Sequence, residues 1–224
     1  MVPAKTGDGR VTRFGGLSHS PVMRCFTGNA MTGVDHGTRS VKSWATVTPS
    51  VEMTRPARCP RCGVGARADG LTIIGHGLSP RCVVVLDDAR GCWVELWLRR
   101  YRCTSCGATC TVGPAEVVPR CRYVRSAIAM ALIAWAHGSS AAAVRAQVCP
   151  DVVRSHDAER DWPSLRRWVR RARRLFGPRC PVAGNTPRAV AARIARWILA
   201  HAPPDTTGAP RSVRAAHAVR ALVF

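Results

Sequence analysis

Two short cysteine loops are the residues of this sequence best suited to chemistry. Cys59-Pro-Arg-Cys-Gly63 and Cys103-Thr-Ser-Cys-Gly107 share the pattern Cys-x-x-Cys-Gly. Two cysteines three positions apart on a tight turn can hold one metal ion from the same side, and the glycine permits the positive φ that such a turn needs. Four thiolates match the closed, tetrahedral site of a structural zinc ion. We therefore predict one structural zinc ion per chain, held by Cys59, Cys62, Cys103 and Cys106.

Another metal or cluster, a redox-active dithiol and disulfide bonds are the alternatives for these cysteines. A thioredoxin-like motif belongs between a strand and a helix of a βαβ unit, and its proline usually precedes the second cysteine, whereas Pro60 follows the first. No secretory signal pattern opens the sequence, so we expect a reducing compartment, in which disulfides are rare. Cys110 is a competing ligand because it follows Cys106 by four positions. The two loops already supply four sulfurs, however, so zinc at those four remains the preferred interpretation.

Strands must bring the two loops together. Residues 63–102 separate them, which exceeds the usual spacing of about 15–20 residues between such pairs. Residues 71–74, 82–86 and 92–102 have the β-branched or alternating character of strands. Residues 87–91, Asp-Asp-Ala-Arg-Gly, are typical of a turn. We therefore predict a zinc ribbon with an elongated hairpin over residues 57–119.

Asp87 and Asp88 resemble a carboxylate pair at the end of a strand. A catalytic two-metal centre would need further carboxylates from other elements of a larger fold, and from this pair to the C-terminus the acidic residues are few and mostly lie in one loop. We interpret the pair as turn residues and expect that the protein is not an enzyme.

The last predicted strand has two different faces. Trp93, Glu95, Trp97, Arg99 and Tyr101 alternate with the apolar residues Val94, Leu96 and Leu98. A hairpin needs only one apolar face, so we expect the aromatic face either to cover another segment or to contact nucleic acid.

Helical patterns follow the ribbon. Residues 123–137, 141–148 and 163–176 carry apolar stripes at helical spacing, with Gly138, Ser140 and Pro163 at positions that end or begin helices. A further helix is predicted over residues 187–201. The predicted fold class is α+β: a small zinc ribbon over residues 57–119, followed by a helical, helix-turn-helix-like domain over residues 120–176. Residues 177–224 are predicted to form a linker and C-terminal helices, and residues 1–56 a disordered or weakly ordered basic arm.

The charge of the chain points to a polyanionic partner. The sequence has 34 Lys and Arg against 13 Asp and Glu, a formal net charge of +21, which favours nucleic acid first and an anionic membrane second. Part of the arginine content has a second explanation in a G·C-rich genome. The longest apolar run, residues 127–136, is too short to span a bilayer.

The helix predicted over residues 163–176 carries six arginines and no acidic residue. Charge runs often form only a solvated face. Here no acidic neighbour four positions away relieves the repulsion, and contact with phosphates explains the pattern. The predicted DNA-contacting residues are Arg166, Arg167, Arg170, Arg171, Arg173 and Arg174.

Three segments together carry a family resemblance. The first is the pair of cysteine loops with the strand that ends Leu-Arg-Arg-Tyr-Arg-Cys103. The others are Pro119-Arg-Cys-Arg-Tyr123 with the helix around Trp135, and Trp162-Pro-Ser-Leu-Arg-Arg-Trp168. Over residues 57–176 the chain resembles the zinc-ribbon plus helix-turn-helix modules at the N-terminal end of bacterial insertion-sequence transposases and their stand-alone relatives. The resemblance implies a DNA-binding accessory or regulator of a mobile element that lacks a catalytic domain.

We therefore expect a cytoplasmic, nucleoid-associated protein that binds double-stranded DNA through a basic helical module held by a zinc ribbon. A transposase or another protein is expected as a further partner, and neither a membrane nor a small-molecule substrate is expected. An RNA- or ribosome-associated zinc ribbon is one alternative, in which Trp93, Trp97 and Tyr101 would contact single strands. A protein-interaction adapter is the other.

Overall fold

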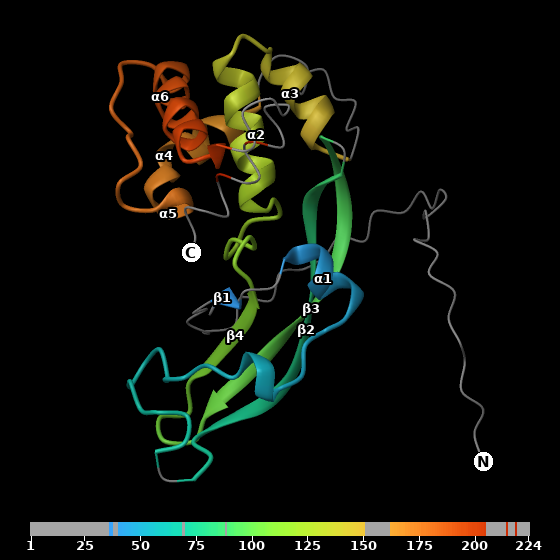
Figure 1. The fold of residues 1–224 in the computed structure, drawn as a ribbon, viewed down its shortest axis with the longest axis vertical. Coiled ribbons are helices and arrows are strands. Elements are labelled where there is room, and N and C mark those ends of the chain that lie inside the picture. Colours follow the sequence, from blue (N-terminus) through green and yellow to red (C-terminus); the bar gives the residue numbers. More distant parts are fainter. Residues whose placement is uncertain are drawn as a thin grey trace, which may run out of the picture.

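A computed structural model describes residues 36–37, 40–68, 70–87, 89–150, 162–204, 214 and 218. The fold is α+β, with a long hairpin that carries the cysteine loops at one end and meets a group of helices at the other (Figure 1). The sheet has the order β1-β4-β3-β2, in which β2, β3 and β4 pair antiparallel and β1 pairs parallel with β4. Its strands are β1 (His36–Gly37), β2 (Ile73–Asp87), β3 (Arg90–Cys103) and β4 (Thr109–Pro114).

The first half of the hairpin is one strand, whereas the sequence predicted two. β2 runs without a break through residues 75–80, the glycine- and proline-containing stretch that separated the predicted strands. A register shift between Gly75 and Leu78 accommodates this stretch, and Pro80 lies opposite Trp97. Both features are tolerated because β2 lies at the edge of the sheet, where a bulge or a proline disrupts no second ladder. The turn prediction is confirmed, since Asp87 pairs with Arg90; Asp88 lies outside the described residues.

β4 is a strand that sequence analysis missed. It pairs with β3 from Arg99–Val112 to Arg102–Thr109 and buries Cys110 and Val112. Six residues containing Gly-Pro carry a weak local signal, so only the pairing partner identifies the strand.

The predicted helices are present. They are α2 (Arg125–Ala136), α3 (Ala141–Val148), α4 (Pro163–Arg170), α5 (Ala172–Phe176) and α6 (Pro187–Ala200). Ser140 caps α3 by accepting a hydrogen bond from the Ala143 N–H. The helix predicted over residues 163–176 is divided at Arg171, whose N–H is shared between the carbonyls of Arg167 and Trp168.

The helix predicted after the linker packs on the helices before it. α6 packs along α2 and also contacts α4, with Val190, Ile194 and Ile198 buried. α6 therefore belongs to the same helical group as α2, α3, α4 and α5, because its apolar stripe completes their core (Figure 1).

The expectation of a weakly ordered arm up to residue 56 is wrong for residues 40–56. α1 (Val41–Thr46) lies against β3 and buries Trp44, whose indole N–H donates to the Trp97 carbonyl at 3.1 Å. A 3-10 turn follows at Glu52–Thr54. The aromatic residues of this segment are scattered and gave no periodic signal. The buried Trp44 nevertheless attaches α1 to β3. Residues 1–35 lie outside the described part of the chain.

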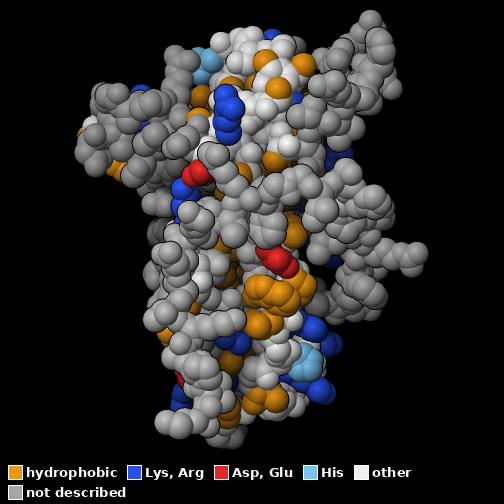
Figure 2. Space-filling model, turned by 90° about the vertical axis from the view of Figure 1, so that its right-hand side faces the viewer, with side chains coloured by type: hydrophobic (Ala, Val, Ile, Leu, Met, Phe, Trp, Pro, Cys, Tyr) orange, Lys and Arg blue, Asp and Glu red, His pale blue; other side chains and the backbone are white. Residues whose placement is uncertain are grey.

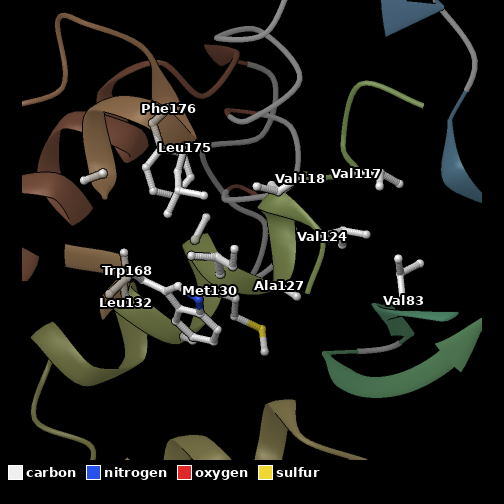
Figure 3. Packing of buried hydrophobic residues seen from close by; sticks show 14 of the residues in the cluster. Val83, Val117, Val118, Val124, Ala127, Met130, Leu132, Trp168, Leu175 and Phe176 are labelled. Carbon is white, nitrogen blue, oxygen red and sulfur yellow. The ribbon is translucent and has the colours of Figure 1, made fainter. Parts of the chain in front are cut away.

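One continuous core joins the hairpin to the helices. Val83 of β2 faces Val117, Val124 and Ala127, and the cluster continues through α2 to Trp168 and Phe176 of α4 and α5 (Figure 3). Gly91 completes the joint: a Cβ at this position would lie 1.9 Å from the Val148 carbonyl oxygen of α3. The close approach of two backbones explains why glycine stands there.

Among the described helices, none combines the length and apolar character required to cross a bilayer.

Candidate metal centre and arginine surface

The four predicted cysteines come together at one end of the hairpin. Their sulfur atoms all lie within 4.8 Å of one another, and none of the four forms a disulfide bond. The Cys59–Cys106 and Cys62–Cys103 sulfur pairs are 3.7 and 3.8 Å apart. A tetrahedral ion with metal–sulfur bonds of about 2.3 Å places its ligands about 3.8 Å apart. The group is therefore close enough to hold a metal ion, and the two printed pairs have the spacing of tetrahedral ligands.

The two cysteine loops have the same backbone geometry. In each, the N–H of the glycine donates to the carbonyl of the first cysteine at 2.9 Å, and the glycine has a φ near +70° (74° for Gly63, 69° for Gly107). The N–H of Cys59 donates to Val64 at 2.9 Å, and that of Cys103 donates to Ala108 at 2.8 Å. Because the two loops have the same hydrogen bonds and the same glycine conformation, each presents its two cysteines in the same way. The cysteine group therefore consists of two matching halves, one from each loop.

The strands set how these halves meet. Cys103 is the last residue of β3 and pairs with Ile73, the first residue of β2. Thr104 then donates its N–H to the Thr72 carbonyl at 2.9 Å. The hairpin register thus holds the second loop beside the chain that follows the first loop.

The largely buried side chain of Arg55 links the segment before the first loop to the start of β2. The Arg55 side chain is only 7% exposed, bonds the Ile73 carbonyl and forms an ion pair with Glu52. Glu52 also pairs with Arg67 at 2.9 Å. These contacts tie residues 52–67 to the start of β2.

Backbone dipoles favour the thiolate form of the first cysteine in each loop. The N–H of Cys106 lowers the pKa of Cys103, more than burial raises it. Burial raises the pKa of Cys59, but the N–H groups of Cys62 and Arg61 together with neighbouring sulfurs outweigh it and bring that pKa to about 6. The thiolate is the form that binds a metal. Several thiolates this close repel one another unless a cation lies between them.

Cys110, the competing ligand, is not part of this group. It lies in β4 opposite Tyr101 and is buried. Its neighbours are core residues rather than the sulfurs of the cysteine group.

All six predicted DNA-contacting arginines are exposed on α4, on α5 or at the junction between them. The opposite side of both helices is buried, through Leu165, Trp168, Val169, Ala172, Leu175 and Phe176. Trp168 packs edge-to-face against Tyr123 and Trp162, with ring centroids 5.1 and 4.9 Å away. The arginine surface therefore lies on a firmly anchored pair of helices.

The aromatic face of β3 is divided. Tyr101 is fully buried, and its hydroxyl bonds Thr54 Oγ1 at 2.6 Å and the Val51 carbonyl at 2.8 Å. Arg99 Nε donates to the Pro49 carbonyl at 2.7 Å. Residues 49–54 therefore cover this half of the face, and the candidacy of Tyr101 for stacking on nucleic acid is wrong.

The other half of that face is open. Trp93 and Trp97 are 39% and 45% exposed. Seen from the right-hand side of Figure 1, hydrophobic side chains reach the surface part-way along the molecule (Figure 2).

The chain has no significant match to a family model, to a characterised protein or to a solved structure.

Proposed function

We propose that this protein binds double-stranded DNA and that a structural zinc ion in the four-cysteine group holds the ribbon end together. The observation that carries the proposal is the acid-free arginine surface of α4 and α5, exposed above a buried apolar stripe. The zinc ion has no catalytic part in this function. It supplies folding free energy to a small module that has little core of its own.

Zinc is the metal that the donor set favours. Four sulfur donors select zinc or iron–sulfur chemistry over calcium, magnesium or manganese, and two matching Cys-x-x-Cys-Gly loops are typical of closed structural zinc sites. The sulfur spacing near 3.8 Å fits the tetrahedral geometry of a single ion.

Stability alone does not account for the arginine surface. Like charges four positions apart on a helix destabilise it by a few tenths of a kcal/mol per pair. α4 contains such a pair at Arg166 and Arg170, and no acidic residue of α4 or α5 offsets it. Phosphate groups of a duplex would turn this repulsion into favourable contacts and would release counterions.

The proposal extends to the biological class suggested by the sequence: a transposase-like accessory or regulator of a mobile element without a catalytic domain. The order of ribbon, α2–α3 and the basic α4 supports it. The loop between α3 and α4, residues 151–161, lies outside the described part of the chain, so a helix-turn-helix geometry remains part of the proposal.

A salt titration of duplex binding tests the DNA-binding function. The variant Arg167→Gln/Arg170→Gln/Arg174→Gln keeps helix-forming side chains on the face opposite the buried stripe, so its melting temperature should stay near that of the parent. If these arginines contact phosphates, the slope of log K against log salt should fall by about 0.9 per contact, about 2–3 in all. A control variant, Arg90→Gln/Arg122→Gln/Arg193→Gln, removes the same charge from exposed positions elsewhere. Equal slopes for the two variants would refute the proposal.

The metal part of the proposal has its own test. Mass spectrometry of the native protein should show one zinc ion per chain, and the variant Cys59→Ser/Cys62→Ser should contain none. Cys110→Ser serves as the control that keeps its metal. Full zinc occupancy in the double variant would overturn the ligand assignment.

A comparison of nucleic acids separates the proposal from its main alternative. An RNA-binding ribbon would prefer single strands or duplex RNA and would lose affinity when Trp93 and Trp97 are changed to Ala. We expect duplex DNA to bind most tightly and these two changes to have little effect.

A further inference from the structure

The cysteine end of the molecule carries a second concentration of arginines. We define the ribbon end as residues 52–76 and 99–111; it contains seven arginines and two acidic residues, Glu52 and Asp69. Four of the arginines are exposed: Arg58, Arg61, Arg67 and Arg102. Arg55 and Arg99, in contrast, bond backbone carbonyls within the fold. Arg58 also donates to the Gly63 carbonyl at 3.4 Å, and Arg67 pairs with Glu52 at 2.9 Å, but all four side chains remain exposed to solvent.

The middle of the hairpin lacks this charge. Residues 77–98 contain Arg81 and Arg90 against Asp87, Asp88 and Glu95, and Arg81 is engaged with the carbonyls of Val118 and Cys121. The surface there is partly hydrophobic, with Trp93 and Trp97 exposed. Within the hairpin, the exposed positive charge is therefore concentrated at the ribbon end. Further exposed arginines lie outside both this end and the α4–α5 surface, at Arg120 and Arg122 before α2 and at Arg193 in α6.

A short chain of contacts fixes the distance between the ribbon end and the α4–α5 surface. Val84 of β2 exchanges backbone hydrogen bonds with the segment around Tyr123: Val84 N donates to Arg122, and Val124 N donates to Val84. The Tyr123 ring packs against Trp168 of α4. The arginine helix is thus attached at the level of Val84, which pairs with Trp93 of β3.

From Trp93 to Cys103, ten residue steps of an antiparallel strand span about 34 Å. One turn of B-DNA has about the same length, about 34–36 Å or about 10 base pairs. In Figure 1, α4, α5 and the cysteine loops lie on the same side of the β2–β3 hairpin. Two basic surfaces separated by about this length would meet the same face of a duplex.

We infer that the ribbon end is a second phosphate-binding surface and that the hairpin is a spacer that lets both surfaces hold one duplex across a single helical turn. This inference rests on the proposed function, since it assigns the α4–α5 surface to the same duplex. A zinc ion with four thiolates carries a charge of about −2, which some of the ribbon arginines offset. Neutralising that charge does not require four exposed arginines spread over both loops.

Duplex length is the variable that tests the inference. Random-sequence duplexes of about 8, 12, 16, 20 and 30 base pairs, labelled for fluorescence anisotropy, are titrated with the full chain at several salt concentrations. Contacts at both surfaces require a duplex of about 15 base pairs. The slope of log K against log salt should therefore rise between the 12- and 16-base-pair duplexes and should then stay constant.

The variant Arg58→Gln/Arg61→Gln/Arg102→Gln removes the second surface. On duplexes of 16 base pairs or more its slope should be smaller than that of the parent by about 2–3, and its rise with duplex length should disappear. The variant should retain one zinc ion per chain, which shows that the cysteine group is intact. The control Arg90→Gln/Arg122→Gln/Arg193→Gln should keep the length dependence.

The outcomes separate the two claims. If the ribbon variant matches the parent at every length while Arg167→Gln/Arg170→Gln/Arg174→Gln weakens binding, the second surface is refuted and the DNA-binding proposal stands. If the ribbon variant and the control lose slope equally, the effect is one of overall charge and the inference is also refuted. If the α4–α5 variant has no effect at any length, the proposed function itself fails.

Discussion

Gly91 offers a direct test of the joint between hairpin and helices. Its φ is not in the left-handed region, so alanine can adopt the same backbone conformation. A Cβ there would lie 1.9 Å from the carbonyl oxygen of Val148 and 2.6 Å from its carbonyl carbon. Real contacts of this kind exceed about 3 Å because of van der Waals repulsion. β3 and the end of α3 must therefore separate by about 1 Å.

The size of the effect follows from the nature of the neighbour. A backbone carbonyl cannot rotate away as a side chain can, so the separation disturbs the packing of Val84 and α3 as well. Overpacking of a core costs about 1–3 kcal/mol, and we expect Gly91→Ala to reach the upper part of that range. For a chain of this length each kcal/mol lowers the melting temperature by about 2–4 °C. The expected loss is therefore about 4–12 °C.

Thermal unfolding followed by circular dichroism measures this loss. Gly65→Ala is the matched control, because its φ is also outside the left-handed region and its added Cβ would have Ala68 at 3.8 Å as its nearest neighbour. Hydrogen exchange should show faster opening of residues 141–148 in Gly91→Ala alone. A melting temperature within about 1 °C of the parent would refute the close approach of Gly91 to Val148, since a real overlap of this size costs at least about 1 kcal/mol.

Three further changes probe other parts of the fold. Tyr101→Phe removes the hydroxyl that bonds Thr54 and Val51; it should lower the free energy of unfolding by about 1–3 kcal/mol, measured by urea denaturation, and an unchanged value would contradict the burial of that hydroxyl. Trp168→Ala removes the ring contacts with Tyr123 and Trp162 and should lower the free energy of unfolding by about 3–5 kcal/mol. The near-ultraviolet circular dichroism signal should be lost as well, and its retention would argue against the aromatic cluster. Removal of the metal by a chelator should make residues 57–70 sensitive to protease while the helical dichroism persists, and equal resistance with and without chelator would count against a structural metal.

Local patterns predicted the cysteine group and the helices well. The ligand pairs are set by three-residue spacing and a following glycine, and both loops adopt the expected turn. Ser140 and Gly138 mark helix ends through interactions with their immediate neighbours. Such features depend on a few adjacent residues, so the sequence is sufficient to find them.

The errors have a common cause in contacts between distant residues. Trp44 donates to Trp97, 53 positions later, and the partners of the Tyr101 hydroxyl lie 47 and 50 positions before it. Nothing near Trp44 or Tyr101 in the sequence predicts these contacts. β4 was missed for the same reason, since its six residues become a strand only by pairing with β3.

The matching halves of the cysteine group have a consequence for how the chain selects its pairing. A shift of the β2–β3 alignment by two residues would preserve which side chains face inward, so hydrophobic burial alone discriminates weakly against it. The same shift would displace Cys103 and Cys106 by about 7 Å relative to the first loop. A metal ion whose ligands must lie about 3.8 Å apart cannot bridge that offset. A metal ion bound at one end would thus select the correct alignment of the whole hairpin, including the distant turn at Asp87 and Arg90.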